Sequence, residues 1–443
     1  MLRLGHLTGQ NVVFGQLPCL SLFTISGLFF HAKCCCGLSG IYRRMRVKGP
    51  RHECVTSICH DWDMETAVPR PVEPNHLFAD STVFEWQNQT LRADLILILP
   101  VALCLGIAIA VGHPAAGLVA AGGAVNTGFG QKHRIDDSYL LPMIFVTFGM
   151  AFSGFFGVLI GHQNFLLVFM AALWGFGYGM LTARPEGYGW VGQQCVITFL
   201  VASAFPASPG EAAGRALLLF AGGALQLVLS SMLLRFFGEL RRHLFQLSCY
   251  LREEQLAVRS ALLETADSLR QRRLTSSAMP YALRLAVTIG IATEIYRRLQ
   301  YPSGYWIPMT ALLVLKPGLT DTAGRAIARM LGTMCGAIAA SYLLANVHAS
   351  PAILAACTVL FAWLAYGFLN VNYALFTMAV TGYIVFLLAL DAAPGPLIAE
   401  RRMFCTLVGG AIAICTRLVV ISYKRRHWLK AASVARHAVS PFR

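Results

Sequence analysis

The sequence predicts an all-α polytopic membrane protein with about twelve transmembrane helices, arranged as two parallel six-helix repeats joined by a short cytoplasmic helical linker. Of the 443 residues, 56% are hydrophobic and only 13% are charged, whereas soluble domains carry about 25% charged residues. The apolar residues form runs of roughly 20, the length that crosses a bilayer. These runs come in two sets, separated by a polar stretch. A soluble fold is therefore excluded.

Residues 1–90 form an unassigned amino-terminal segment that is rich in cysteine. A zinc site is not expected, because Cys34, Cys35 and Cys36 are consecutive and no C-x2-C pairs recur. The apolar stretch 11–30 resembles a signal-peptide core or a weak extra span, but fits neither pattern well. The composition favours a third interpretation, in which translation starts at Met45 or Met64 and the preceding residues are not a designed segment.

Residues 91–237 are expected to form the first six-helix membrane bundle. Its apolar runs are 94–112, 114–129, 139–161, 163–182, 188–205 and 212–237. The polar stretch 238–280 follows, and no membrane core would accept its many arginines and carboxylates. Within it, Leu240, Leu244, Leu247, Leu251 and Val258 form a heptad-like stripe. This spacing predicts an amphipathic cytoplasmic helix or helical hairpin.

Residues 281–423 are expected to form the second bundle, and 424–443 a basic cytoplasmic tail. The apolar runs of this bundle are 281–299, 304–318, 325–347, 351–369, 372–390 and 402–423. The segment from Arg215 to Ala224 aligns without a gap to that from Arg402 to Ala411, and an even number of helices makes such repeats parallel. Small-residue stripes that allow close helix packing occur in both bundles. They comprise Gly149, Ser153, Gly157 and Gly161, and Ala328, Gly332, Gly336 and Ala340.

The net charge of +15 is interpreted as a topology signal rather than as a nucleic-acid footprint, because cytoplasmic loops of membrane proteins carry excess lysine and arginine. Most short-loop cations fall on one side, which predicts that both termini are cytoplasmic. The pairs Arg297-Arg298 and Arg401-Arg402 fall near the opposite side and count against this orientation.

Two short apolar segments are the best candidates for a substrate site. Residues 305–333 contain Pro308 and Pro317, which remove backbone donors and favour a broken helix. The first-bundle counterpart, 113–128, is also short and interrupted, and paired interrupted helices mark binding sites in transporters. A packing or re-entrant helix is the alternative. The candidate substrate-binding residues are Tyr305, Trp306, Thr310, Lys316, Arg325, Arg329, Thr333, Asn126 and Thr127.

Arg325 and Arg329 lie four residues apart and share a helix face. Two cations in or near the membrane indicate a bound anion, a carboxylate partner or a position at the interface. Further candidates for proton coupling or for charge pairing are Glu294, Asp321, Arg284, Arg215 and Arg402. A carboxylate among them could relay a proton, or simply pair with a nearby arginine.

No Walker A sequence, H-E-x-x-H motif or G-x-S-x-G elbow occurs in the chain. The G-x-G-x-x-G match at Gly187–Gly192 lacks the βαβ context that dinucleotide binding requires. We therefore predict that the chain is not an enzyme and that it has no catalytic residues, no metal site and no cofactor.

The residues Tyr305-Trp306, Arg325, Arg329, Gly332-Thr333 and Gly336, preceded by Ala282-Leu283-Arg284, resemble the fusaric acid resistance and aromatic acid exporter family (FUSC-like). The resemblance is specific over about 281–420, whereas the first bundle is similar mainly in layout. It implies a multi-pass inner-membrane efflux component of a Gram-negative bacterium that exports aromatic carboxylates, often beside a periplasmic adaptor protein. The chain departs from longer members by its short central stretch.

Three functional hypotheses follow from the sequence. The first is an efflux transporter of small organic anions, such as aromatic carboxylates, that works by secondary transport and could be coupled to protons. The alternatives are a passive anion channel and a non-transporting membrane scaffold. The expected partners are the lipid bilayer, a small organic anion, the periplasmic adaptor protein and further copies of the chain in a homo-oligomer, but no nucleic acid.

Overall fold

The computed structural model describes residues 77–135, 138–161, 164–239, 278–346, 350–390 and 395–439. The regular structure in these ranges is helical, apart from an isolated antiparallel bridge between Ile135 and Ser138. The cysteines of the amino-terminal segment and the leucine stripe of the linker lie outside the described residues.

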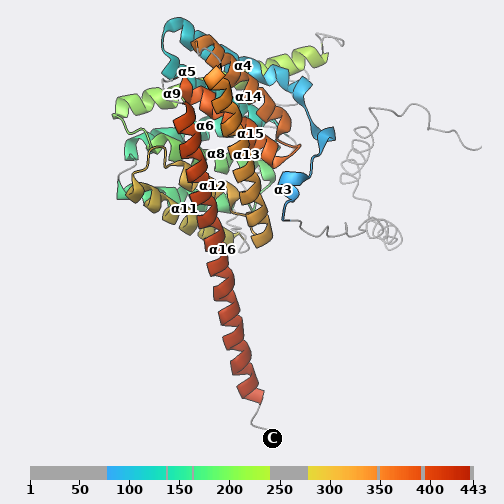
Figure 1. Ribbon diagram of the computed structural model, residues 1–443, viewed down its shortest axis with the longest axis vertical. Coiled ribbons are helices and arrows are strands. Elements are labelled where there is room, and N and C mark those ends of the chain that lie inside the picture. Colours follow the sequence, from blue (N-terminus) through green and yellow to red (C-terminus); the bar gives the residue numbers. More distant parts are fainter. Residues whose placement is uncertain are drawn as a thin grey trace, which may run out of the picture. The chain divides into compact units, whose positions relative to one another are not determined.

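The first set of helices begins with two short turns and continues with six longer apolar helices (Figure 1). The turns are α3 (Ala79–Thr82) and η1 (Trp86–Asn88), and the helices are α4 (Leu91–Val111), α5 (Pro114–Gly130), α6 (Leu140–Ile160), α7 (Phe165–Leu181), α8 (Glu186–Ser203) and α9 (Pro209–Glu239). Gly112 ends α4 in the left-handed conformation, with φ 78°, which glycine adopts at little cost. Pro114 then starts α5 at a position where no backbone donor is needed.

The second set follows the linker and also contains six helices. These are α11 (Met279–Leu299), α12 (Trp306–Val314), α13 (Leu319–Asn346), α14 (Pro351–Phe368), α15 (Tyr373–Ala389) and α16 (Gly395–Val439). Ser350 and Asn372 cap α14 and α15, because their side-chain oxygens accept hydrogen bonds from backbone N–H groups of the first turn.

Every apolar run predicted from the sequence overlaps a helix, and six of the described helices are long and apolar enough to cross a membrane. These six are Leu91–Val111, Leu140–Ile160, Pro209–Met232, Leu319–Asn346, Pro351–Phe368 and Leu397–Tyr423; α7 and α15 are shorter apolar helices. The protein is therefore a helical multi-pass membrane protein. The number of twelve spans stays a prediction.

The prediction of two interrupted segments was only half right. Residues 113–128 are not interrupted, because Pro114 occupies the first helical position and α5 continues without a break to Gly130. The run 304–318 contains only the nine-residue helix α12, which tolerates Pro308 in its first turn. The chain then becomes extended at Leu315 and turns after Pro317, where Thr322 donates a hydrogen bond to the Gly318 carbonyl.

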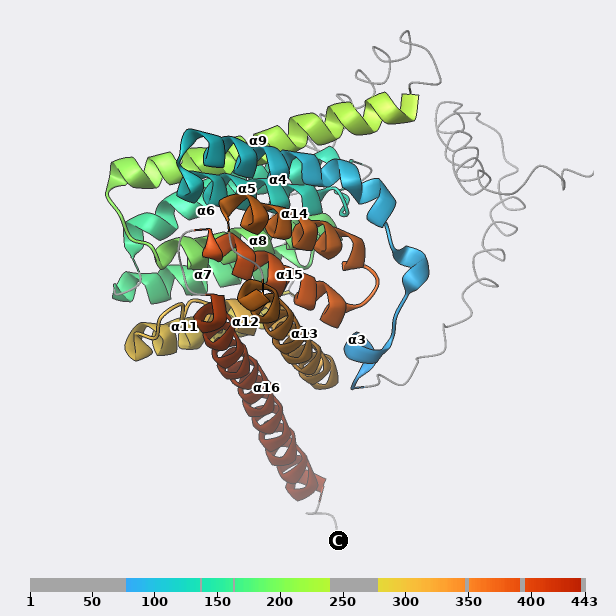
Figure 2. The same ribbon diagram turned by 45° about the horizontal axis from the view of Figure 1, so that its top comes forward.

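The main packing contacts of the first set recur in the second. Helix α5 packs on α9 as α12 packs on α16, and α6 packs on α8 and α9 as α13 packs on α15 and α16. Two further contacts join the sets reciprocally, since α4 packs on α14 and α7 packs on α11. In Figure 2, α9 lies along α4 and α5.

Glycines lie where these helices approach each other most closely, at aligned positions of the two sets. Gly222 leaves no room for a Cβ beside the Ala120 carbonyl, and Gly409 leaves none beside the Ile307 carbonyl. The register that aligns Gly222 with Gly409 also aligns Ala120 with Ile307. Small residues therefore allow the close backbone approach that the stripes predict.

A second pair of glycine crossings matches in the same way. Gly157 abuts the Phe199 carbonyl, and Gly336 abuts that of Met378. The register that aligns Gly157 with Gly336 also aligns Phe199 with Met378. The contact of α6 with α8 is thus equivalent to the contact of α13 with α15.

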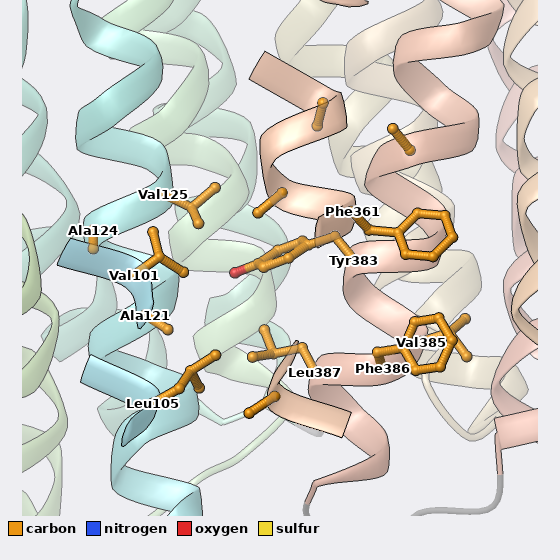
Figure 3. Close-up of a cluster of buried hydrophobic side chains, with 14 of the residues drawn as sticks. Val101, Leu105, Ala121, Ala124, Val125, Phe361, Tyr383, Val385, Phe386 and Leu387 are labelled. Carbon is orange, nitrogen blue, oxygen red and sulfur yellow. The ribbon is translucent and has the colours of Figure 1, made fainter. Parts of the chain in front are cut away.

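A buried apolar cluster holds the two sets together where α4 and α5 face α14 and α15 (Figure 3). Val101, Leu105 and Val125 lie on one side of it, and Phe361 and Phe386 on the other. The Tyr366 hydroxyl crosses the same contact and donates a hydrogen bond to the Val125 carbonyl, 2.9 Å away.

Candidate functional site: a buried cationic cluster

Four helices of the second set bring polar side chains together, each along a stripe with i, i+4 spacing. The stripes contain Trp306 and Thr310 on α12, Arg325, Arg329 and Thr333 on α13, Tyr373, Thr377 and Thr381 on α15, and Arg402 and Thr406 on α16. Residues four apart lie on one helix face. The close crossings at Gly332, Gly336 and Gly409 hold α13 against α15 and α12 against α16. We call Trp306, Arg329, Tyr373, Thr381 and Arg402 the cationic cluster.

Arg402 is the most deeply buried arginine of the cluster, with 1% of its surface exposed. Its guanidinium lies over the Trp306 ring, with Cζ 4.1 Å from the ring centroid. Its Nε donates a hydrogen bond to Thr381 Oγ1 at 3.2 Å. Its Nη1 is buried and has no hydrogen-bond partner in the described part of the chain. The ring and the hydroxyl thus fix the guanidinium, while one donor stays available.

Arg329 is 4% exposed and donates a hydrogen bond from Nη1 to the Tyr373 hydroxyl at 3.1 Å. Its Nε is also buried, with no hydrogen-bond partner among the residues that the structure describes. The positive charge of Arg329 lies close enough to act on Arg402. Two like charges in a buried place repel each other, and each guanidinium favours a compensating anion.

Within the described residues, no carboxylate neutralises the charge of this site. The ion pairs of the described residues include neither Arg329 nor Arg402. The buried hydroxyls of Thr310, Thr333 and Thr377 also have no hydrogen-bond partner among these described residues. Buried polar groups in native proteins are nearly always satisfied. Several unsatisfied donors on converging helix faces are therefore the expected signature of a site for a small anion.

Arg325 and Lys316 add two further positive charges near the start of α13. Arg325 Cζ lies 3.4 Å from the Tyr373 ring centroid, and Nη1 lies 3.5 Å from Asp80 Oδ2 on α3. Burial lowers the pKa of Lys316, and the positive charge of Arg325 lowers it further. An anion beside Lys316 would favour its charged form.

The segment before the first membrane helix covers this end of the second set. The Asn372 side chain donates a hydrogen bond to the Val83 carbonyl, and Glu85 N–H donates one to the Val371 carbonyl. Gly324 lies directly against the Leu77 carbonyl. Asp80 is therefore held in place as a tethered carboxylate beside Arg325.

The structure brings together the predicted binding residues of the second set but not those of the first. Tyr305 contacts Trp306, with ring centroids 5.0 Å apart. Asn126, in contrast, donates its side-chain hydrogen bond to the Gly122 carbonyl, and the Thr127 hydroxyl lies 3.1 Å from that of Thr147. Neither partner belongs to the cationic cluster.

Of the residues predicted for proton coupling or charge pairing, some also lie away from the cationic cluster. Glu294 pairs with Arg297 and Arg298 on its own helix, so it is a local ion-pair partner. Asp321 is exposed in the first turn of α13. Arg215 donates a hydrogen bond to the Phe205 carbonyl at 2.6 Å. Arg402 enters the cluster, and Arg284 lies elsewhere, near the start of α11.

Sequence reasoning missed Tyr373, Thr377 and Thr381. Their i, i+4, i+8 spacing was a usable signal, since a polar stripe on an otherwise apolar helix marks a face turned away from lipid. It also missed the pair between Asp94 and Lys132, whose Oδ1 and Nζ lie 2.6 Å apart. Those two residues are distant in sequence, and only the packing of α4 on α5 brings them together.

Residues 291–416 match the family model described as fusaric acid resistance protein-like. The predicted resemblance to this family is confirmed. The matched range includes α12 to α15 and the first part of α16, so it contains every member of the cationic cluster. The fusaric acid resistance-like part of the chain and the candidate site are thus the same region.

Similar curated proteins match the chain only in part. An uncharacterised protein of Synechocystis sp. (slr1298) is 30% identical over 142 residues, which are 32% of this chain and 19% of that protein. The uncharacterised protein YhfK of Escherichia coli is 33% identical over 140 residues, 32% of this chain and 20% of the relative. The uncharacterised protein ORF2 of Neisseria gonorrhoeae is 35% identical over 94 residues, 20% of this chain and 22% of the relative. The chain thus matches about a fifth of the length of these relatives, and no solved structure matches it.

Proposed function

We propose that this protein is an inner-membrane efflux transporter of small organic anions, and that its substrates are aromatic carboxylates. The observation that carries the proposal is the pair Arg329 and Arg402, two buried guanidinium groups with free donors and no carboxylate partner among the described residues. A planar guanidinium binds a carboxylate through two parallel hydrogen bonds. The Trp306 and Tyr373 rings supply flat apolar surface for an aromatic ring.

The resemblance to the fusaric acid resistance-like family supports membrane transport as the setting for this site. We further propose that the twelve helices of the two sets lie in the membrane as two parallel six-helix repeats, with both termini in the cytoplasm. The recurring packing pairs and the matching glycine crossings support this arrangement. No catalytic role is proposed for any residue.

Transport is proposed to be secondary, because the chain contains no Walker A sequence for ATP use. We propose protons as the coupling ion, which requires a titratable group near the cationic cluster. Glu294 and Asp321 are poor candidates for the coupling group, since one is paired with two arginines and the other is exposed. Lys316 is the better candidate, because its pKa is lowered by burial and by Arg325, a neighbour of the cluster residue Tyr373.

The experiment is transport of a panel of hydroxybenzoates into inverted membrane vesicles, with and without a pH gradient. We expect saturable accumulation that the gradient drives, and its loss in vesicles containing Arg402→Gln. Accumulation that never exceeds equilibrium, together with single-channel currents in bilayers, would identify a passive channel. An absence of any flux across the panel would contradict the proposal.

A further inference from the structure

A second pair of arginines lies in the same bundle, away from the cationic cluster. Arg417 follows Arg402 on α16 by about 22 Å along the helix axis, at about 1.5 Å per residue. Arg284 lies near the start of α11, a helix that packs against α16. The pair is therefore a separate place in the fold.

Both guanidinium groups are incompletely satisfied. Arg417 is 8% exposed, and its Nε has no hydrogen-bond partner within the described ranges. Nε and Nη1 of Arg284 are also buried without a hydrogen-bond partner among the described residues. Within the described residues, no carboxylate forms an ion pair with either arginine. A buried cation without a partner is costly. Arg417 is such a cation, and the half-buried Arg284 places a second positive charge near it, so a compensating anion is favoured.

The surroundings of the pair are also suited to an anion. The two positive charges act on each other and on Tyr281, whose ring centroid lies 6.0 Å from Arg284 Cζ. The Tyr281 hydroxyl donates its hydrogen bond to the Leu315 carbonyl at 3.1 Å. Because the ring is held by this bond, it forms a fixed wall beside Arg284, as Trp306 does beside Arg402.

The first bundle does not repeat this feature. In the register that aligns Gly222 with Gly409, Arg417 corresponds to Ser230, which is buried and accepts a hydrogen bond from Gln226 at 2.9 Å. In the register that aligns Leu91 with Leu283, Arg284 corresponds to Arg92, which is exposed. The equivalent buried place in the first bundle is therefore neutral and internally bonded.

We propose that Arg284 and Arg417 form a second anion-binding site, which takes a carboxylate or phosphate group independently of the cationic cluster. The anion has two natural sources, a soluble organic acid and the phosphate of an anionic lipid. Planar guanidinium forks on two helices bind either group through paired hydrogen bonds. The inference goes beyond the proposed function, since it requires binding at this site but no transport.

The test uses the purified full chain carrying Arg402→Gln, which removes the main site from the signal. Benzoate and inorganic phosphate are titrated by calorimetry in detergent, and phosphatidylglycerol retention is measured by native mass spectrometry. We expect at least one of these probes to bind, and both Arg417→Gln and Arg284→Gln to weaken its binding by about tenfold or more. Arg425→Gln, an exposed position on the same helix, is the matched control and should change nothing.

The two sources give different results. Binding of benzoate or phosphate that both variants weaken identifies a soluble anion, and loss of retained phosphatidylglycerol in both identifies a lipid headgroup. Either result supports the second site. Equal binding of every probe with and without the two arginines would overturn it, as would no binding at all. Because the readout is binding in an Arg402→Gln background, failure here is distinct from failure of the transport proposal.

Discussion

The first bundle (α4 to α9) and the second bundle (α11 to α16) share the same pattern of helix contacts. They differ in whether their buried charged side chains form ion pairs. In the first bundle, the buried carboxylate of Asp94 pairs with Lys132, so the charges compensate each other. In the second, Arg329 and Arg402 are buried without a carboxylate among the described residues. Among the described residues, the buried charge of Asp94 is therefore compensated within the first bundle, whereas the buried charges of Arg329 and Arg402 in the second are not.

The two bundles also differ at the positions that align with the arginines of α13. In the register that aligns Gly157 with Gly336, Arg325 and Arg329 correspond to Val146 and Met150. Both of these side chains are apolar and fully buried. The same helix crossing thus encloses hydrocarbon in one bundle and cations in the other, so the packing plan alone does not specify the site.

The largest expected effect concerns Arg402. Replacing it by glutamine removes a buried charge that would face the substrate carboxylate, so the transport rate at low substrate concentration should fall by about 30-fold or more. The measurement is the initial rate of benzoate uptake by proteoliposomes. Arg215→Gln, at the position that aligns with Arg402 in the first bundle, is the matched control, because Arg215 bonds to the Phe205 carbonyl. Equal losses in both variants would remove the distinction between the bundles.

Stability, in contrast to transport, should depend more on Asp94 than on Arg402. Asp94→Asn leaves Lys132 charged in a largely buried place, which should cost about 3–5 kcal/mol and lower the thermal unfolding temperature. Adding Lys132→Met should restore much of the loss. Arg402→Gln should leave the unfolding temperature of the anion-free protein unchanged or higher. A strong destabilisation by Arg402→Gln would mean that its charge is already compensated.

The shared packing plan is tested by glycine substitutions. A methyl group at Gly409 would meet the Ile307 carbonyl, and one at Gly222 would meet that of Ala120. Each alanine substitution should therefore destabilise the fold by about 1–3 kcal/mol, measured by thermal unfolding in detergent. Gly410→Ala is the matched control, since the nearest atom to an added methyl group there would be Ala326 Cβ, at 3.7 Å. Different costs at Gly222 and Gly409 would argue against equivalent crossings.

The smallest effect is expected at the ion pair between Asp80 and Arg325, whose side chains are 37% and 28% exposed. A partly exposed pair is worth about 1 kcal/mol or less. If Asp80 competes with the substrate for Arg325, Asp80→Asn should tighten benzoate binding a few-fold in calorimetry. Glu85→Gln removes an acid from the same segment without touching Arg325 and should have no effect. Weaker binding in Asp80→Asn would show that the tethered carboxylate does not compete.

Much of the fold followed from the sequence, because a run of apolar residues leaves the chain no alternative to a helix in lipid. The second-bundle site also followed in part, since Arg325, Arg329 and Trp306 lie close together in the chain. Asn126 and Thr127 do not join the cationic cluster, and the interruption predicted for 113–128 does not occur, because Pro114 stands at the first position of a continuous α5. The polar stripe that contains Tyr373 is visible in the sequence, but its contact with Arg329 is not, since only the crossing of α13 on α15 brings the two side chains together.

The most direct test of the anion site is an experimental structure of the full chain with 4-iodobenzoate, whose iodine is located by anomalous scattering. We predict a peak beside the Trp306 ring, with the carboxylate bonded to Arg329 and Arg402, and no peak near Val146 and Met150 of the first bundle. A saturated crystal with no iodine at the cationic cluster would contradict the central claim.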